Sequence, residues 1–197
     1  DLLNSNHVPF FEPGLEELVS KNFSSGRLKF TTNMKLGVKN SDIIFICVGT
    51  PTLKRKRSAD LRNVFKVVTE IRKYINRFKI IVTKSTVPIT TGDKIEKLIL
   101  KKKRKKLFEV VSNPEFLREG EAIRDFRFPD RIVVGSNNDK VTKKLESLYD
   151  PLIKKGAKFF STNRRGAELI KYASNAFLAT KISYINELAN LCEKTNI

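Results

Sequence analysis

Two patterns of apolar residues alternate along most of the chain. Short runs that are almost wholly apolar are followed by longer stretches in which apolar residues recur every three or four positions. The runs are typical of strands in a buried parallel sheet, and the stretches are typical of amphipathic helices. The predicted strands are 27–31, 42–48, 79–83, 107–112, 131–135 and 157–160. The predicted helices open at 12–15, at Asn33, after Asp60 as the N-cap, at Thr91 or Gly92, and at Asp139.

Strands that alternate with helices predict the α/β fold class, with a doubly wound parallel sheet. Parallel strands need crossover helices, which cover both faces of such a sheet. The run 42–48 is apolar at both alternating sets of positions, so it is expected to be a central strand.

A different pattern begins at Asn163 or Arg164 and continues to about Lys194. Apolar or small residues fall at spacings of three and four, without a proline, at Ile170, Ala173, Phe177, Thr180, Tyr184, Leu188 and Cys192. This predicts one helix of about 30 residues, or roughly 45 Å. Such a helix extends beyond an ordinary α/β layer, so it is expected to lead into a second domain or to form an oligomer interface.

The chain is strongly basic, with 39 Lys and Arg against 21 Asp and Glu and a net charge of +18. Ten of these basic residues lie in two runs, 54–57 and 101–106. Neither run contains an aromatic residue on which a base could stack, which disfavours nucleic-acid binding. A basic nucleic-acid-binding α/β protein remains an alternative, as does a non-catalytic module that binds a partner through the long helix.

Several other classes are disfavoured by composition. No apolar run reaches the roughly 18 residues that a membrane span needs. Two cysteines cannot form a disulfide framework or a four-ligand zinc site, so no metal site and a reducing, cytoplasmic location are expected. Cys47 lies in a predicted buried strand and Cys192 on the apolar stripe of the long helix, so both are expected to be inert structural thiols.

Polar residues follow three of the predicted strands. Ligands bind beyond the carboxyl ends of strands in open α/β sheets, so these exits are expected to line one rim. Glycine and proline also simply end strands, and each exit by itself fits that interpretation equally well. The exits are Gly49-Thr50-Pro51-Thr52, Ser85-Thr86-Val87-Pro88 and the segment from Asn113 to Gly120.

The third exit and the long helix hold the candidate catalytic groups. Asn113 fits a helix cap with Pro114 in the first turn, and a helix there would place Glu115 and Glu119 on one face, four residues apart. Two carboxylates at a rim suit general acid and base chemistry, although they are also common on a solvated surface. Lys171 and Asn175 are likewise four apart and could stabilise an oxyanion; an exposed lysine that pairs with Glu168 is the alternative.

The chain resembles the UDP-glucose 6-dehydrogenase family along nearly its whole length. The matching segments are PFFEPGLEELV (9–19), SDIIFICVGTPT (41–52), SADL (58–61), TKSTVP (83–88), SNPEFLREGEAIRDFRFPDRIVVG (112–135) and ELIKYASNAFLATKISYINELANLCEK (168–194). The resemblance implies NAD-dependent oxidation of UDP-glucose to UDP-glucuronate in two hydride transfers. GDP-mannose or UDP-N-acetylmannosamine is the alternative substrate within this family.

The resemblance also implies roles for individual residues. Lys171 and Asn175 would stabilise the oxyanion, and Thr86 and Glu115 would handle water and a proton. The residues expected to contact NAD are Val48, Gly49, Thr50, Pro51, Thr52, Ser85, Thr86, Val87 and, at the nicotinamide ribose, Glu119. The sugar site would be lined by Glu115, Phe116, Leu117, Arg118 and Glu119, together with Lys171 and Asn175.

The chain also departs from the family pattern. It contains no GxGxxG turn for the dinucleotide pyrophosphate and no GGSCFPKD-like motif with the catalytic cysteine. The resemblance therefore implies an incomplete, N-terminally truncated Rossmann-like domain at 1–162 and, at 163–197, the start of the central helix through which the full enzyme forms a homo-oligomer. The chain alone is expected not to turn over UDP-glucose and to be poorly soluble as a monomer.

Overall fold

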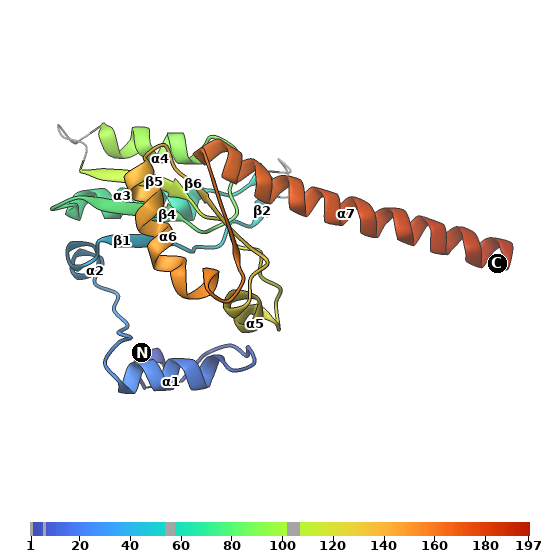
Figure 1. Ribbon diagram of the computed structural model, residues 1–197, viewed down its shortest axis with the longest axis horizontal. Helices are drawn as coiled ribbons and strands as arrows, with labels where there is room; N and C mark the ends of the chain where they lie inside the picture. The colour runs from blue at the N-terminus through green and yellow to red at the C-terminus, as the bar shows by residue number, and fades with distance from the viewer. Residues whose placement is uncertain (1, 6, 54–57, 102–106) are drawn as a thin grey trace.

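The computed structural model describes residues 2–5, 7–53, 58–101 and 107–197. One twisted sheet with helices on both faces forms the body of the molecule (Figure 1). Helix α7 (Arg164–Thr195) projects far out of this body, and helix α1 (Leu15–Ser24) lies apart from it, at the bottom of the view in Figure 1, whereas α4 (Thr91–Leu100) lies at the top. No helix in the described part of the chain has the length and apolar character needed to cross a membrane.

The sheet has five strands in the order β1-β4-β5-β6-β7. Their bounds are Ile43–Ile46, Lys79–Thr83, Phe108–Ser112, Arg131–Gly135 and Lys158–Thr162. All neighbours are parallel except β5 and β6, which pair antiparallel at Ser112 and Gly135. The prediction of a wholly parallel sheet is therefore wrong at this one pair. The connection between β5 and β6 carries only the six-residue helix α5 (Ala122–Arg127), and the chain turns back along β5 without a crossover helix.

Two apolar clusters, one on each face of the sheet, confirm the doubly wound α/β fold. The first joins β1, β4 and β5 to α2 (Met34–Asn40), α3 (Arg62–Tyr74) and α4. The second joins β4, β5 and β6 to α6 (Asp139–Ile153). Every residue of β4 and β5 is buried, including the charged residues Lys79 and Glu109.

Strand β1 is an edge strand and not the central strand that its sequence predicts. It pairs only with β4 among the described strands, and the side chain of Phe45 is 38% exposed. Cys47, which follows β1, is exposed, so its predicted burial is also wrong. The apolar run indicates that both faces of the strand are apolar, but it does not indicate whether a second strand pairs with it.

The N-terminal segment contains less regular structure than its pattern predicts. A short 3-10 helix (Leu2–Ser5) and α1 are present, and α1 has no buried residue. Residues 27–31 form no strand. Phe30, one of the alternating apolar residues in this segment, instead contacts α1. Its ring stacks on that of Phe23, and the two ring centroids are 6.0 Å apart. This local contact explains why apolar and polar residues alternate here although the segment forms no strand.

Helix α3 begins slightly later than predicted. Leu61 is its N-cap residue, and Asp60 is not, although the Asp60 carboxylate still accepts a hydrogen bond of 3.0 Å from the backbone N–H of Arg62. Before this helix, two strands of two residues each, β2 (Thr52–Leu53) and β3 (Ser58–Ala59), pair antiparallel. The basic run 54–57 lies outside the described residues, as does the run 101–106 apart from Lys101.

The predicted long helix is confirmed as α7, which has 32 residues. The side chain of Asn163 caps it by accepting a 2.8 Å hydrogen bond from the backbone N–H of Gly166. The first turns of α7 lie against β5 and β6. The approach is so close that a Cβ atom on Gly135 would lie 2.6 Å from the Cβ atom of Ala167, so only glycine fits at the end of β6.

Candidate functional site

The first two strand exits form one continuous rim. Strands β1 and β4 are parallel neighbours, so their carboxyl ends lie at the same edge of the sheet. The hydroxyl of Ser85 donates a 2.6 Å hydrogen bond to the carbonyl of Val48, and the hydroxyl of Thr50 donates a 2.9 Å bond to the carbonyl of Thr86. These two bonds hold the two loops together, as the strand order predicts.

This rim suits part of a dinucleotide site. Gly49 is exposed, and a Cβ atom there would meet no atom within 4 Å, so a ligand can approach its backbone. Thr86 is half-buried beside it, whereas the Val87 side chain is buried in the first core cluster and can offer a ligand only its backbone. The hydroxyls of Thr50 and Ser85 are engaged within the rim and act mainly to shape it.

The third exit does not form the predicted helix. Residues 113–118 are irregular, and the nearest helix, α5, begins only at Ala122. Asn113 is not a cap: its buried amide donates a 2.8 Å hydrogen bond to the carbonyl of Val133, and its Oδ1 atom accepts a bond from the hydroxyl of Tyr149. The helical pairing of Glu115 with Glu119 is therefore wrong, because contacts with β6 and α6 outweigh the local helix-start pattern.

Glu115 and Lys171 come together at this exit. The Lys171 ammonium lies 3.2 Å from Oε1 of Glu115, and the lysine side chain is only 9% exposed. The backbone N–H of Leu117 donates a 2.6 Å hydrogen bond to Oε2 of the same carboxylate, which fixes its orientation. A buried cation held by an oriented carboxylate is suited to stabilising negative charge on a bound ligand.

The ring of Phe116 lies between two cations. The Lys171 ammonium is 5.2 Å from its centroid, and the Arg131 guanidinium at the start of β6 is 4.3 Å from it. Both distances are within the range of cation–π attraction. The exit loop is therefore held from α7 on one side and from β6 on the other.

A cavity of about 90 Å³ lies behind this loop. Its walls include Lys84, Asn113, Glu115, Arg131 and Tyr149. The volume is below the roughly 300 Å³ of a complete small-molecule pocket, so it can hold only part of a ligand. The Lys84 ammonium donates a 3.3 Å hydrogen bond to Oδ1 of Asn113 and lies 5.8 Å from the Tyr149 ring centroid.

Burial is the main cause of the pKa shifts of Lys84 and Tyr149 in this cavity. It lowers the pKa of Lys84 from its ordinary 10.5 to about 8, because the interior disfavours the ammonium. Burial also raises the pKa of the Tyr149 hydroxyl to about 12, which keeps that hydroxyl neutral as a hydrogen-bond donor. The cavity thus holds an amine that changes charge close to physiological pH.

The stability of the chain is expected to depend on this amine. Between pH 8 and 10.5 the unfolded chain binds more protons than the folded chain at Lys84, so the free energy of unfolding should rise with pH by at most ~3 kcal/mol. Lys84→Met should remove this rise. Urea unfolding of both proteins at several pH values in this window measures the difference, and parallel pH profiles would contradict the assignment.

The remaining predicted site residues lie further out. Arg118 is exposed, and its guanidinium lies 2.7 Å from Asp125 on α5, whose pKa the hydrogen bonds from Arg118 lower to about 2. Glu119 and Asn175 are exposed and do not line the cavity. Their expected contacts with cofactor and substrate stay predictions. Among the residues that the structure describes, no group of three or more His, Cys, Asp or Glu side chains is placed so that it could bind a metal ion.

Several residues of the site were not predicted. Lys84 follows β4, Arg131 begins β6 and Tyr149 lies on α6, and no local spacing in the sequence indicates that these three residues line one cavity. Arg164 and Glu168 are buried polar residues at the start of α7 that face α4. Their spacing of four was a usable signal, since it places two charged residues on the helix face that also carries Lys171.

Comparisons with known proteins show the family to which this sequence is similar. The sequence profile described as "UDP-glucose/GDP-mannose dehydrogenase family, NAD binding domain" matches residues 1–153. The profile of the same family's central domain matches residues 165–197. A UDP-glucose 6-dehydrogenase of Rhizobium meliloti is 48% identical over 98% of this chain and 44% of its own length. One from Bacillus subtilis is 49% identical over 98% of this chain and 43% of its own length.

Solved structures of similar proteins share the fold of this chain. A UDP-glucose dehydrogenase from Pyrobaculum islandicum superposes with a TM-score of 0.89 at 40% identity, over 95% of this chain and 43% of that one. A GDP-mannose dehydrogenase from Pseudomonas aeruginosa gives a TM-score of 0.89 at 38% identity, over 95% and 44% of the two chains. The chain thus spans less than half the length of the relatives that it matches.

Proposed function

The chain belongs to the UDP-glucose/GDP-mannose dehydrogenase family, and from this premise we propose that the protein containing it oxidises UDP-glucose to UDP-glucuronate with NAD. Two hydride transfers convert the primary alcohol of the sugar into a carboxylate, with one water consumed. The chemistry that NAD would supply is hydride acceptance, with one molecule of NAD reduced in each of the two transfers. The residues of this chain are proposed to bind and orient the cofactor and the sugar, and to stabilise the charge that develops on the sugar oxygen.

The contact between Lys171 and Glu115 carries the proposal. Oxidation of an alcohol or hydration of an aldehyde develops negative charge on the sugar oxygen. A buried ammonium 3.2 Å from an oriented carboxylate is a suitable donor for that oxygen, because it is held in place before the charge develops. Glu115 and Thr86 are the groups proposed to accept the proton and to hold the water.

The rim formed by Val48–Thr52 and Ser85–Val87 supports the proposed dinucleotide contact. It lies at the carboxyl ends of neighbouring parallel strands, where α/β folds bind such cofactors. Exposed Gly49 leaves space above its backbone for a flat group. The buried face of α7 presents Lys171 beside the next strand exit, which would place the sugar next to the cofactor.

The choice of UDP-glucose is supported by the relatives. The Rhizobium and Bacillus proteins that are named UDP-glucose 6-dehydrogenases are 48% and 49% identical to this chain, whereas the GDP-mannose dehydrogenase is 38% identical. The homo-oligomer proposed for the full protein is supported by the exposed apolar side chains of α7. These include Phe177, Leu178, Ile182, Tyr184, Ile185, Leu188 and Leu191.

A chimeric enzyme tests the function of this segment. Residues 1–197 replace the matching segment of the Rhizobium meliloti enzyme, so that the remainder of that enzyme is supplied by the relative. The chimera is expected to form NADH from UDP-glucose, and to form it more slowly from GDP-mannose or UDP-N-acetylmannosamine. Absorbance at the NADH band measures the rate for each substrate.

The parent enzyme and a folding measurement serve as controls. A chimera that unfolds cooperatively and elutes as the parent does, yet forms no NADH from any of the three substrates, would contradict the proposed activity. Faster oxidation of one of the other two nucleotide sugars would contradict the choice of UDP-glucose.

A further inference from the structure

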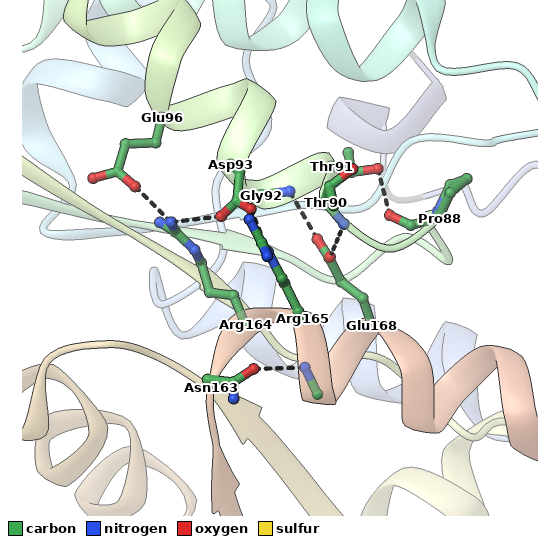
Figure 2. Close-up of polar contacts among 11 residues, drawn as sticks. Pro88, Thr90, Thr91, Gly92, Asp93, Glu96, Asn163, Arg164, Arg165 and Glu168 are labelled. Carbon is green, nitrogen blue, oxygen red and sulfur yellow. Dashed lines mark hydrogen bonds and ion pairs between the residues drawn. The ribbon is translucent and has the colours of Figure 1, made fainter.

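The amino end of helix α4 is capped by a residue from a different helix. Thr90, its N-cap residue, has a left-handed backbone with φ of 75°, and its own side chain makes no capping hydrogen bond. The carboxylate of Glu168 on α7 fills that role instead. It accepts a 2.7 Å hydrogen bond from the backbone N–H of Thr90 and another of 2.7 Å from that of Gly92 (Figure 2).

The carboxylate of Glu168 is buried in this contact. The residue is 2% exposed, and burial raises the pKa of its carboxyl although the two backbone donors oppose that shift. Gly92 leaves the necessary space, because a Cβ atom there would lie 3.2 Å from Oε1 of Glu168. One turn earlier on α7, the guanidinium of Arg164 bonds to Asp93 at 2.9 Å and to Glu96 (Figure 2).

The same carboxylate is close to both halves of the proposed site. Glu168 and Lys171 are three residues apart, so they lie on one face of α7. On the other side, Thr90 ends the short loop that begins at Ser85, and the hydroxyl of Thr91 bonds to the carbonyl of Pro88 at 2.6 Å and closes that loop. The loop that we assign to the cofactor and the lysine that we assign to the sugar are therefore connected through one side chain.

We propose that Glu168 is a positioning residue, which fixes the loop 85–90 and Lys171 relative to each other by capping α4 from α7. The effect of Glu168 on catalysis rests on the proposed function, but its effect on the position of Lys171 can be tested without substrate or cofactor. Loss of the carboxylate frees the first N–H groups of α4 and allows α7 to rotate or shift. Lys171 then moves away from Glu115 and becomes accessible.

The test measures how fast the Lys171 amine reacts with an acylating reagent in the 197-residue chain. The rate is normalised to Lys181, which is exposed on the same helix. Glu168→Ala is expected to increase the relative rate at Lys171 by about fivefold, the factor that one lost hydrogen bond typically represents. Glu168→Gln keeps the shape and one acceptor, so its effect should be smaller but in the same direction.

Val141→Ala is the matched control. It removes core contacts from α6 on the other face of the sheet and should destabilise the chain without changing the labelling of Lys171. An unchanged Lys171 rate in Glu168→Ala, or an equal increase in Val141→Ala, would overturn the inference. The labelling test requires neither NAD nor substrate, so an inactive chimera combined with the expected labelling would refute the proposed function and leave the positioning role of Glu168 standing.

The kinetic arm uses the chimeric enzyme. Glu168→Ala should lower kcat by about fivefold and Glu168→Gln by less, while KM for UDP-glucose changes little, because the lysine is displaced at the point where charge develops. A purely structural role would lower the amount of active enzyme and leave kcat per folded molecule unchanged. That result would also overturn the inference.

Discussion

Replacement of Lys171 by methionine is expected to lower kcat of the chimeric enzyme by about 10²–10³-fold, with a much smaller change in KM for UDP-glucose. The physical reason is the position of the ammonium. Its side chain is nearly buried and is held 3.2 Å from Glu115, so it costs little reorganisation when the sugar oxygen gains charge. Methionine keeps the length of the side chain but cannot donate a hydrogen bond. Steady-state NADH formation at several UDP-glucose concentrations measures both constants.

Lys181→Met provides the control for this prediction. Lys181 is a lysine on the same helix, and its side chain is exposed. Its substitution should leave both kinetic constants unchanged. Equal losses in the two variants would indicate a general effect on α7, and a fully active Lys171→Met enzyme would exclude the proposed charge stabilisation.

Replacement of Arg164 by methionine is expected to lower the free energy of unfolding by about 3 kcal/mol. The Arg164 side chain is 5% exposed and pairs with Asp93 and Glu96, both of which are largely shielded from water. Burial alone would raise the pKa of Asp93, but the hydrogen bonds from Arg165 and Arg164 reverse this and lower it. Methionine would leave two acidic groups in this environment without their buried cation. Urea denaturation at neutral pH measures the loss.

The adjacent arginine is a close control. Arg165 also pairs with Asp93, at 2.7 Å, but its side chain is 67% exposed. Exposed pairs typically contribute below ~1 kcal/mol, so Arg165→Ala should have a small effect. A loss in Arg164→Met no greater than that in Arg165→Ala would show that the buried pairs do not hold α7 to α4.

The parts of the fold that depend on local periodicity were predictable. Short, mainly apolar runs predict β4 and β5, and the three-and-four spacing after Asn163 predicts α7 almost to its ends. The antiparallel pairing of β6 was not predictable, because strand direction depends on how the chain returns after Ser112. The edge position of β1 depends on its neighbours and not on its own residues.

The site was predictable only where its residues follow strands or share a helix face. Thr86, Glu115 and Lys171 come from such signals. The helix predicted at Asn113 failed because the side chain of Asn113 bonds to Val133 and Tyr149, which are distant in sequence. The sequence suggests Glu168 only as a partner for Lys171, whereas in the structure it caps α4. Long-range hydrogen bonds of this kind leave no periodic trace in a sequence.

The length of α7 has a mechanical consequence. Its first turns are fixed between β6 and α4, while residues 175–191 are all exposed. At 1.5 Å per residue, the portion beyond Lys171 extends roughly 36 Å, so a tilt of about 10° at the base would displace the tip by about 6 Å. The helix is therefore a lever arm, and sub-ångström adjustments around Glu168 would be magnified at whatever surface its far end touches.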